Sequence, residues 1–328
     1  MPASLLKTLD QVRAKRDLSV FDLTSIDDLT DQDIELILEL AQIFQTAPSA
    51  KLELLMGTAI VNAFFENSTR TRLSFELAGK ELGADTVNIS ANESSVKKGE
   101  SSLDTIQTLA ALGPKIIVMR TSESGLPSQL KKYSAASIVN AGDGRNEHPS
   151  QALLDARTML DQHGSLNGKT VTIVGDLLHS RVFGSLRRIL PRLGAKIRVS
   201  CPETLLPPEL DRKKIPYCSD VEEALVGADV VYALRVQEER GAKGYISSLK
   251  EYFRLYGITP KRFALAAKNA ILMHPGPVIR DTDLHFDLLK HERCHVLKQV
   301  ANGLAVRKAI LWLLGDRKDG KVKSSIRG

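Results

Sequence analysis

A series of short apolar runs, each ending at polar or glycine residues, constrains the fold of this chain more than any other feature. Helical patterns separate most of the runs, and β-branched residues are frequent within them. Strands that alternate with helices in this way predict parallel sheets. The runs are Thr58–Phe65, Thr86–Ile89, Ile116–Met119, Ile138–Val139, Val171–Val174, Ile197–Val199, Val230–Leu234 and Ile271–Met273. Two sets of runs predict an α/β fold with two similar domains, each a parallel sheet flanked by helices.

The helical segments show apolar residues at helical spacing. The first strong one runs from Asp31 to about Thr46, with Thr30 as its cap and Asp33 in its first turn. Further examples are Thr71–Leu82 and Leu186–Leu193. A last helix, Val300–Leu314, is nearly apolar throughout and should be buried.

The composition fits a globular protein with two domains. The chain has 328 residues, more than one typical core needs, and 43% of them are apolar. Its formal net charge of +6 suits nucleic acid, an acidic membrane surface or small anionic substrates, and composition alone does not decide among them. No apolar run approaches the roughly 20 residues of a membrane helix. The N-terminus lacks the apolar stretch of a signal peptide, although its basic, mildly amphipathic character leaves an organelle-targeting role open.

The cysteines point to a reducing compartment. Cys201, Cys218 and Cys294 lie far apart and form no CxxC pair. This spacing argues against a zinc site and predicts reduced thiols in a cytosolic protein. The turn Gly175–Ser180 has no GxGxxG pattern, which argues against dinucleotide binding.

Cations and amides gather after the runs, where the carboxyl ends of parallel strands bind ligands. Arginines at strand ends favour small anions over a basic nucleic-acid face, and only 5% of the residues are aromatic. The residues after the runs are, in order, Glu66 and Ser68–Arg72; Ser94, Lys97 and Lys98; Arg120; Gly142-Asp143-Gly144, His148 and Gln151; Asp176 and Arg181; Arg235 and Gln237; and His274–Pro277.

Three of these positions suit phosphate or carbonyl chemistry. At Ser68–Arg72 a strand ends and a helix begins, so free N–H groups and the helix dipole favour an anion, unless the segment is an ordinary helix cap. Arg120, at the end of an apolar strand, should meet an anion or an acidic neighbour. His148 precedes a helix, whose dipole favours a neutral imidazole that polarises a carbonyl oxygen; the alternative is a histidine that only bonds backbone.

The second half of the chain offers groups for carboxylates. Arg235 and Gln237 are separated by one residue in an extended run and should face the same way. Together with Arg181 they suit a dicarboxylate. The loop Glu93–Glu100 is either a solvated loop or a basic arm that reaches a phosphate, and Glu238–Ser248 could close over a ligand.

Taken together, these motifs resemble the carbamoyltransferase family. The matching segments are Ser68-Thr69-Arg70-Thr71-Arg72, His148-Pro149-Ser150-Gln151 and His274-Pro275-Gly276-Pro277. Arg235-Val236-Gln237, followed by Glu239-Arg240, resembles the aspartate-using members. The resemblance runs in order from about Leu29 to Leu314.

The resemblance implies a role for each matching residue. The residues for carbamoyl phosphate would be Ser68, Thr69, Arg70, Thr71, Arg120, His148, Gln151, Ser94, Lys98, Pro275 and Gly276. Those for aspartate would be Arg181, Arg235, Gln237 and Lys98. The catalytic groups would be Arg70, Thr71, Arg120, His148 and Lys98. Glu66 and Arg240, with Arg181, would form ion pairs that stabilise the closed state.

The resemblance also implies the organisation and the reaction. Residues 1–147 would bind carbamoyl phosphate and residues 148–298 aspartate, with a helix at 299–315 packing back on the first domain and a polar tail at 316–328. A carbamoyl group would move to L-aspartate without a metal or cofactor, early in de novo pyrimidine biosynthesis. The expected assembly is a homotrimer in which Ser94 and Lys98 reach a neighbouring subunit's site. A regulatory chain or pathway enzyme as a further partner stays open.

The alternatives are an ornithine-type enzyme, an enzyme for another amino acid, and a non-catalytic anion-binding scaffold. Ornithine carries a second amine, so Arg181 and Arg235 disfavour it. A scaffold without catalysis would be free to lose Arg120, His148 or Arg235, and all are present.

Overall fold

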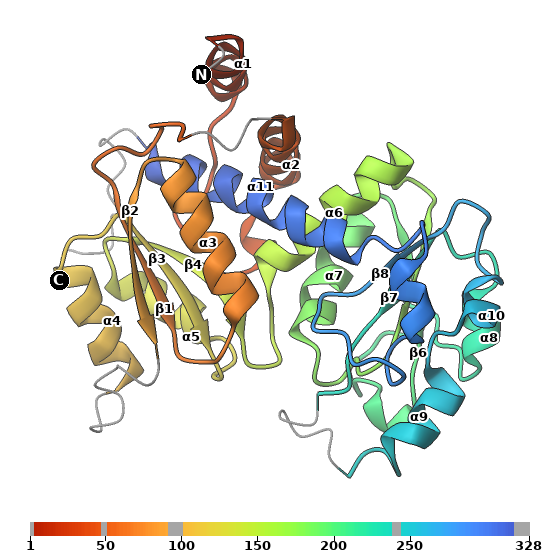
Figure 1. Cartoon of the computed structure of the whole chain (residues 1–328). Coiled ribbons are helices and arrows are strands. Elements are labelled where there is room, and N and C mark those ends of the chain that lie inside the picture. Colours follow the sequence, from red (N-terminus) through yellow and green to blue (C-terminus); the bar gives the residue numbers. More distant parts are fainter. Residues whose placement is uncertain (1–2, 47–50, 91–100, 238–243, 318–328) are drawn as a thin grey trace. The chain divides into compact units, whose positions relative to one another are not determined.

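The computed structural model describes residues 3–46, 51–90, 101–237 and 244–317. The chain divides into two compact units, Met1–Arg157 with Asn302–Gly328, and Thr158–Ala301. Each unit is built on one four-stranded sheet whose neighbouring strands are all parallel (Figure 1). The predicted fold class is therefore confirmed. None of the helices in the described ranges is long and apolar enough to cross a membrane.

The sheet of the first unit has the strand order β2-β1-β3-β4. Its strands are β1 (Ala59–Phe64), β2 (Asp85–Ser90), β3 (Ile116–Thr121) and β4 (Ser137–Asp143). Its helices include α1 (Ala3–Lys15), η1 (Ile26–Asp28), α2 (Asp31–Thr46), α3 (Thr69–Glu81), α4 (Ser102–Ala111), α5 (Leu126–Leu130) and η3 (Lys131–Tyr133). Two helices, α6 (Pro149–His163) and α11 (Val296–Gly315), contribute residues to both units.

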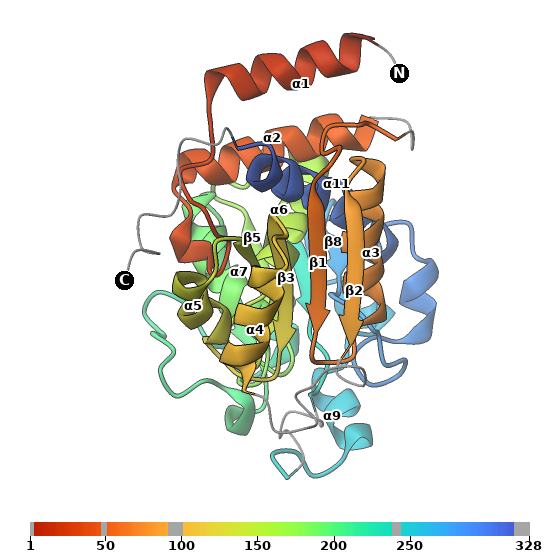
Figure 2. The same cartoon turned by 90° about the vertical axis from the view of Figure 1, so that its left-hand side faces the viewer.

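Strand alternation decides which helices cover each face of this sheet. Val61 and Ile117 point to one face, where they form an apolar cluster with Ile106 of α4. On the other face α3 packs so closely that a Cβ at Gly79 would lie 3.4 Å from the side chain of Ile60. Figure 2 shows α3 and α4 on opposite sides of the β1 and β2 strands, and α1 lying beside α2.

The second unit repeats this plan with the strand order β6-β5-β7-β8. Its strands are β5 (Thr170–Val174), β6 (Lys196–Ser200), β7 (Val230–Ala233) and β8 (Ile271–Met273). Its helices include α7 (Arg181–Arg192), η4 (Glu203–Leu205), α8 (Val221–Leu225), α9 (Leu249–Tyr256), α10 (Pro260–Phe263) and η6 (Phe286–Lys290). Alternate residues of the strands, such as Val174 and Val231, form one apolar core with Leu225 of α8 and Phe263 of α10.

All eight predicted runs correspond to strands, and α2 has the predicted bounds. The run Thr58–Phe65 extends one residue beyond β1 at each end, and Val230–Leu234 extends one residue beyond β7. The main difference is α7, which begins at Arg181 and not at the predicted Leu186. Ser180 caps it by accepting a hydrogen bond from the Phe183 N–H at 3.2 Å. Gly184 and Ser185 interrupt the apolar periodicity of its first turns, so the pattern alone hid its start.

Helix α11 is largely buried from Asn302 onward, as predicted, whereas Val300 is 51% exposed. The buried part is not apolar where it packs on α3. Arg307 is only 4% exposed and Lys308 only 3%. Arg307 donates a hydrogen bond to the Ser74 hydroxyl at 2.7 Å, and Lys308 pairs with the Glu81 carboxylate at 2.8 Å. Both partners belong to α3. Polar contacts therefore help to fix α3, which the apolar pattern did not indicate.

The strand order locates a ligand-binding edge in each unit. In open parallel sheets, ligands bind beyond the carboxyl ends of the strands, where the direction of the connections reverses. In the first unit this switch lies between β1 and β3, and in the second between β5 and β7. We call the carboxyl ends of the strands the ligand edge of each unit.

Candidate active site

The start of α3 lies at the ligand edge of the first unit. Ser68 is its N-cap residue, with extended backbone, and the Ser68 hydroxyl makes no capping hydrogen bond. Thr71, in the first turn, is buried. The Arg70 residue is exposed at the surface, but its guanidinium is partly desolvated, and this burial lowers the pKa of Arg70. Hydroxyls, first-turn N–H groups and a guanidinium thus gather at a helix N-terminus, which favours an anion.

Arg120 lies beside this helix start, at the end of β3. Its carbonyl accepts a hydrogen bond from the Phe65 N–H at 2.8 Å, which joins the ends of β1 and β3. Its Nε lies 3.4 Å from the Glu66 carboxylate, and its guanidinium donates to the Ala141 carbonyl at 3.3 Å. Glu66 therefore contacts an arginine of its own unit, and Arg120 is held at the switch point between β1 and β3.

The loop that precedes His148 is fixed by the buried carboxylate of Asp143. This carboxylate accepts hydrogen bonds from the Gly125 N–H at 2.6 Å and the Glu147 N–H at 3.0 Å. It also accepts from the side-chain amides of Asn140 at 2.8 Å and Asn146 at 2.9 Å. Such a carboxylate, fully enclosed by donors, rigidifies the loop around it.

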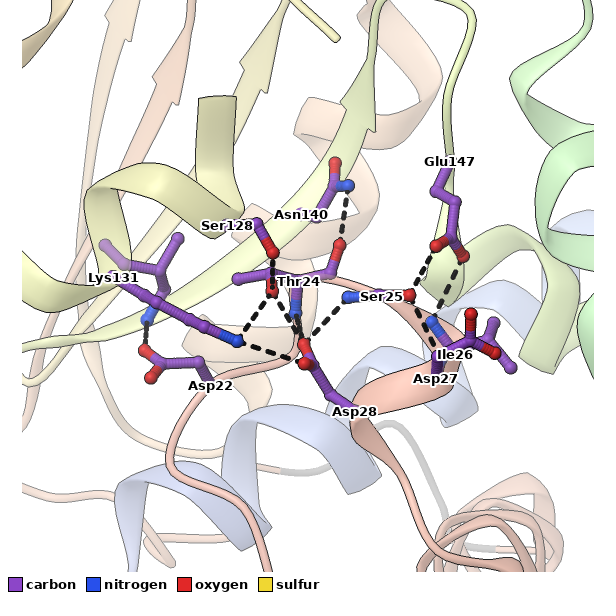
Figure 3. A network of polar contacts seen from close by, with 11 residues as sticks. Asp22, Thr24, Ser25, Ile26, Asp27, Asp28, Ser128, Lys131, Asn140 and Glu147 are labelled. Atoms are coloured by element: carbon purple, nitrogen blue, oxygen red, sulfur yellow. Dashed lines mark hydrogen bonds and ion pairs between the residues drawn. The ribbon is translucent and has the colours of Figure 1, made fainter. Parts of the chain in front are cut away.

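Glu147 ties the same loop to the segment before α2. Its carboxylate, 1% exposed, accepts hydrogen bonds from the Ser25 hydroxyl and from the Ile26 N–H, the latter at 3.1 Å (Figure 3). Asp28, a few residues further on, pairs with Lys131 at 3.0 Å. Burial alone would raise the pKa of Asp28, but hydrogen bonds and the charge of Lys131 outweigh it and lower that pKa.

His148 and Gln151 stand at the start of α6. The His148 carbonyl accepts hydrogen bonds from the N–H groups of Gln151 at 3.0 Å and Ala152 at 3.2 Å, so His148 occupies the N-cap position. His148 is 4% exposed and Gln151 8%. The Gln151 amide nitrogen donates to the Asp155 carboxylate at 3.0 Å. The helix dipole disfavours added positive charge on the imidazole at this position.

The ligand edge of the second unit carries the groups predicted for carboxylates. Arg181, 2% exposed, is the first residue of α7 and follows β5. Arg235 follows the adjacent strand β7 and donates to the Gln237 side-chain oxygen at 3.2 Å, so these two side chains lie on the same side of the chain, as predicted. Buried Asp176 joins the two loops, because it accepts the Gln237 N–H at 3.0 Å and the ring and backbone N–H of His179.

The turn after β8 is shaped by a buried histidine. His274 accepts the Gly276 N–H on Nδ1 at 2.8 Å, so its Nε2 is the protonated nitrogen and faces the Asp283 carboxylate at 3.2 Å. Gly276 has a left-handed backbone with φ 66°, which suits glycine. The positions of the Pro275 and Gly276 carbonyls therefore depend on the imidazole of His274.

The structure brings some of the predicted site residues into contact, and others lie outside the described residues. At the first ligand edge it brings Glu66 onto Arg120, and at the second it brings Arg235 onto Gln237. Ser94, Lys98 and Arg240 lie outside the described residues. The sequence reasoning placed Asp143 after a strand without giving it a role, and it missed three further buried acidic residues that support the site: Glu147, Asp155 and Asp283.

Proximity in sequence was a signal for Glu147, which is next to His148, and for Asp155, which lies one helical turn from Gln151. Asp283, nine residues after His274, carried no such signal. In the parts of the chain that the structure describes, no group of three or more His, Cys, Asp or Glu side chains is placed to hold a metal ion.

Comparisons with known proteins agree with this arrangement. The family model for the carbamoyl-P binding domain of aspartate/ornithine carbamoyltransferases matches residues 22–161, and the model for the Asp/Orn binding domain matches residues 167–314. An aspartate carbamoyltransferase catalytic subunit from Acetivibrio thermocellus is 46% identical over 303 residues, which cover 92% of this chain and 97% of that protein.

Solved structures give the same result. The aspartate transcarbamoylase of Trypanosoma cruzi in complex with carbamoyl phosphate and aspartate has a TM-score of 0.81 and 32% identity, and the match covers 89% of this chain and 96% of that one. The ornithine carbamoyltransferase of Thermus thermophilus has a TM-score of 0.80 and 25% identity, with 90% of this chain and 99% of that one covered. With both domain models matched in order, the chain belongs to the aspartate/ornithine carbamoyltransferase family.

Proposed function

We propose that this protein transfers the carbamoyl group of carbamoyl phosphate to the amine of L-aspartate, giving N-carbamoyl-L-aspartate and phosphate. The observation that carries the choice of aspartate is the pair of cations, Arg181 and Arg235, that follow the adjacent strands β5 and β7 at the ligand edge of the second unit. Two guanidinium groups suit two carboxylates. The second amine of ornithine would be repelled there. The relatives named as aspartate carbamoyltransferase catalytic subunits support the same choice.

Carbamoyl phosphate is assigned mainly to the first unit. Its phosphate would bind Ser68, Thr69, Arg70 and Thr71 at the start of α3, and Arg120 would bridge phosphate and carbonyl oxygen. His148 and Thr71 would donate to the carbonyl oxygen, and Gln151 would accept from the carbamoyl nitrogen. Ser94 and Lys98 would add contacts to the phosphate, and the carbonyls of Pro275 and Gly276 would accept from the amide end.

Aspartate is assigned to Arg181, Arg235, Gln237 and Lys98. The contact between Arg235 and Gln237, and the hydrogen bond that joins Gln237 to Asp176, support a preformed pocket wall for a carboxylate. Glu66 and Arg240, with Arg181, would form the ion pairs of the closed state. Because Glu66 lies 3.4 Å from Arg120 in this structure, closure would require its carboxylate to exchange partners.

The reaction follows from the chemistry of the two substrates. The aspartate amine attacks the carbonyl carbon, the C–N bond forms, and the C–O bond to phosphate breaks. Negative charge that builds on the carbonyl oxygen is met by Arg120, His148 and Thr71, and losing one such donor typically costs about 2.7–4 kcal/mol in the barrier. The departing phosphate can accept the amine proton. His148 then acts as a polariser of the carbonyl and not as the general base.

The assembly is proposed to be a homotrimer with shared sites. Ser94 and Lys98 would reach the site of a neighbouring subunit. Support comes from two apolar side chains on α3, four residues apart, because Leu73 is 46% exposed and Leu77 50%. Exposed apolar residues grouped in this way are typical of subunit contacts. We infer a cytoplasmic enzyme of de novo pyrimidine biosynthesis, which agrees with three free cysteines.

The test is carbamoyl transfer by purified protein, with L-aspartate, L-ornithine and no amine compared. Turnover with aspartate alone is expected. Arg235→Ala should raise the KM for aspartate roughly 10- to 150-fold, because one charge-assisted hydrogen bond is lost. Arg254→Ala is the matched control, since Arg254 is 76% exposed and forms only a long ion pair. Turnover with ornithine, or no turnover by folded protein, would overturn the proposal.

A further inference from the structure

We propose that Asp155 is a positioning residue that fixes the orientation of the Gln151 carboxamide, so that Gln151 presents its oxygen and not its nitrogen to the amine end of carbamoyl phosphate. The inference rests on the proposed function, because it concerns how the same site distinguishes an amide from other acyl phosphates. It adds a residue that does not touch the substrate.

The contact between the two side chains permits only one amide orientation. Gln151 and Asp155 lie one turn apart on α6, and the Gln151 nitrogen is 3.0 Å from the Asp155 carboxylate oxygen. Asp155 is 0% exposed and Gln151 8%. An ionised carboxylate accepts hydrogen bonds but cannot donate one. It therefore bonds the NH₂ end of the amide, and the carboxamide oxygen is directed away from it.

Arg307 supplies the charge that favours the ionised form of Asp155. Burial lowers the pKa of Arg307 to about 10, and attraction to the Asp155 carboxylate opposes that shift. Arg307 is itself well held, because it donates to Ser74 at 2.7 Å and its guanidinium lies 5.1 Å from the centre of the Phe75 ring. Asp155 thus lies near a buried cation that donates hydrogen bonds but accepts none.

Space for this cation depends on Gly303. A Cβ at that position would lie 2.7 Å from the Arg307 guanidinium nitrogen. The apolar helix α11 therefore carries its buried charge next to a residue without a side chain. Arg307 thus acts on Asp155 through its charge, and Asp155 acts on Gln151 through their hydrogen bond.

The orientation decides which ligand the site accepts. A carbamoyl NH₂ is a donor, so an oriented Gln151 oxygen can accept from it, whereas an acetyl methyl group leaves that oxygen unpaired. Sites built around a buried hydrogen bond reject the ligand that lacks the partner group. Asp155 should therefore contribute to the preference for an amide over a methyl ketone.

The experiment uses two stable ligands that bind but are not transferred. Phosphonoacetamide keeps the amide, and 2-oxopropylphosphonate replaces its NH₂ by a methyl group. Calorimetry gives the ratio of their Kd values for the wild type, Asp155→Asn and, as a control on the same helix, Asp161→Asn. An asparagine can donate to the Gln151 oxygen, so in D155N the preference for the amide should fall about tenfold or more, while D161N should keep it.

The effect must pass through Gln151. In a Gln151→Ala background, D155N should change the ratio less than twofold. If D155N does not fold because the buried Arg307 loses the attraction of the Asp155 charge, D155N/R307M is compared with R307M, since removing two opposite buried charges together is often tolerated. An unchanged ratio in D155N, or a full effect in the Q151A background, would overturn the inference. Because binding is measured without aspartate, failure of carbamoyl transfer would sink the proposed function separately.

Discussion

Replacing Glu147 by alanine removes the carboxylate that ties the loop before His148 to the segment before α2. The Ser25 hydroxyl and the Ile26 N–H lose their acceptor, and the latter bond, 3.1 Å long, is buried. Hydrogen bonds to a charged group contribute about 1.5–3 kcal/mol each, or roughly 3–6 kcal/mol for two. Glu147→Ala also removes the desolvation free energy of a buried carboxylate, which offsets part of this loss. We therefore expect the free energy of unfolding to fall by about 2–4 kcal/mol.

Glu147→Gln is the matched comparison. Its amide oxygen can still accept the Ile26 N–H, and the Ser25 hydroxyl can rotate to accept from its amide nitrogen, so the loss should be about 1 kcal/mol. Activity should separate the variants as well, because His148 follows directly. A shift of the imidazole by about 1 Å can cost roughly 100-fold in rate. The kcat/KM of E147A should therefore be well below that of E147Q.

The assay is urea unfolding at one fixed protein concentration, since an oligomer's stability depends on concentration. Carbamoyl transfer is then measured at a temperature where every variant is folded. The reasoning fails if E147A unfolds within about 0.5 kcal/mol of the wild type, or if E147A and E147Q are equally destabilised. A folded E147A with wild-type kcat/KM would show that this anchor does not position His148.

Three further predictions concern other parts of the chain. Cys201 is fully buried, and burial raises the pKa of its thiol, so iodoacetamide should label it only after unfolding, as peptide mass spectrometry can show. Gly144→Ala should cost more stability than Gly57→Ala, since both have positive φ but only at Gly144 would a Cβ meet a backbone oxygen, at 2.8 Å; equal melting temperatures would contradict this. The folded-state pKa of Asp28 is lowered, with burial opposed by hydrogen bonds and Lys131, so its ionised form stabilises the fold above the unfolded pKa of about 3.9. That contribution should be lost as the pH falls below that value, and the stability gap between wild type and Asp28→Asn should narrow in acid unfolding curves.

The strands could be predicted because they are marked locally. Runs such as Val171–Val174 are buried on both faces, as expected for parallel strands covered by two helix layers. The ligand edge followed from topology, since residues that come after parallel strands must gather at one edge of the sheet. Strand alternation was informative as well, because the prediction that Arg235 and Gln237 face the same way agrees with the hydrogen bond between their side chains.

The supporting contacts could not be predicted in the same way. Glu147 and Ser25 are 122 residues apart in the sequence, and no local pattern pairs them. The apolar sequence around Arg307 and Lys308 gave no indication that these two cations of α11 have polar partners on another element. A buried arginine nevertheless requires such partners. Gln151 and Asp155 are the exception, because a spacing of four residues on one helix is enough to predict that the two side chains are neighbours.

The buried carboxylates explain how acidic groups can lie so close to cationic ligand sites without neutralising them. Asp143 is occupied by backbone and amide donors, and Asp176 by the N–H groups of His179 and Gln237. Asp283 accepts from the Ile279 N–H and faces the His274 ring. A carboxylate whose lone pairs are taken by such donors stabilises the loop around it and has little capacity left for an arginine.

Glu66 differs from these carboxylates, because it lies against Arg120 itself. A phosphate that binds Arg120 must compete with that carboxylate, so Glu66→Gln should strengthen phosphate binding, while neutralising Asp143 or Asp176 should weaken the fold.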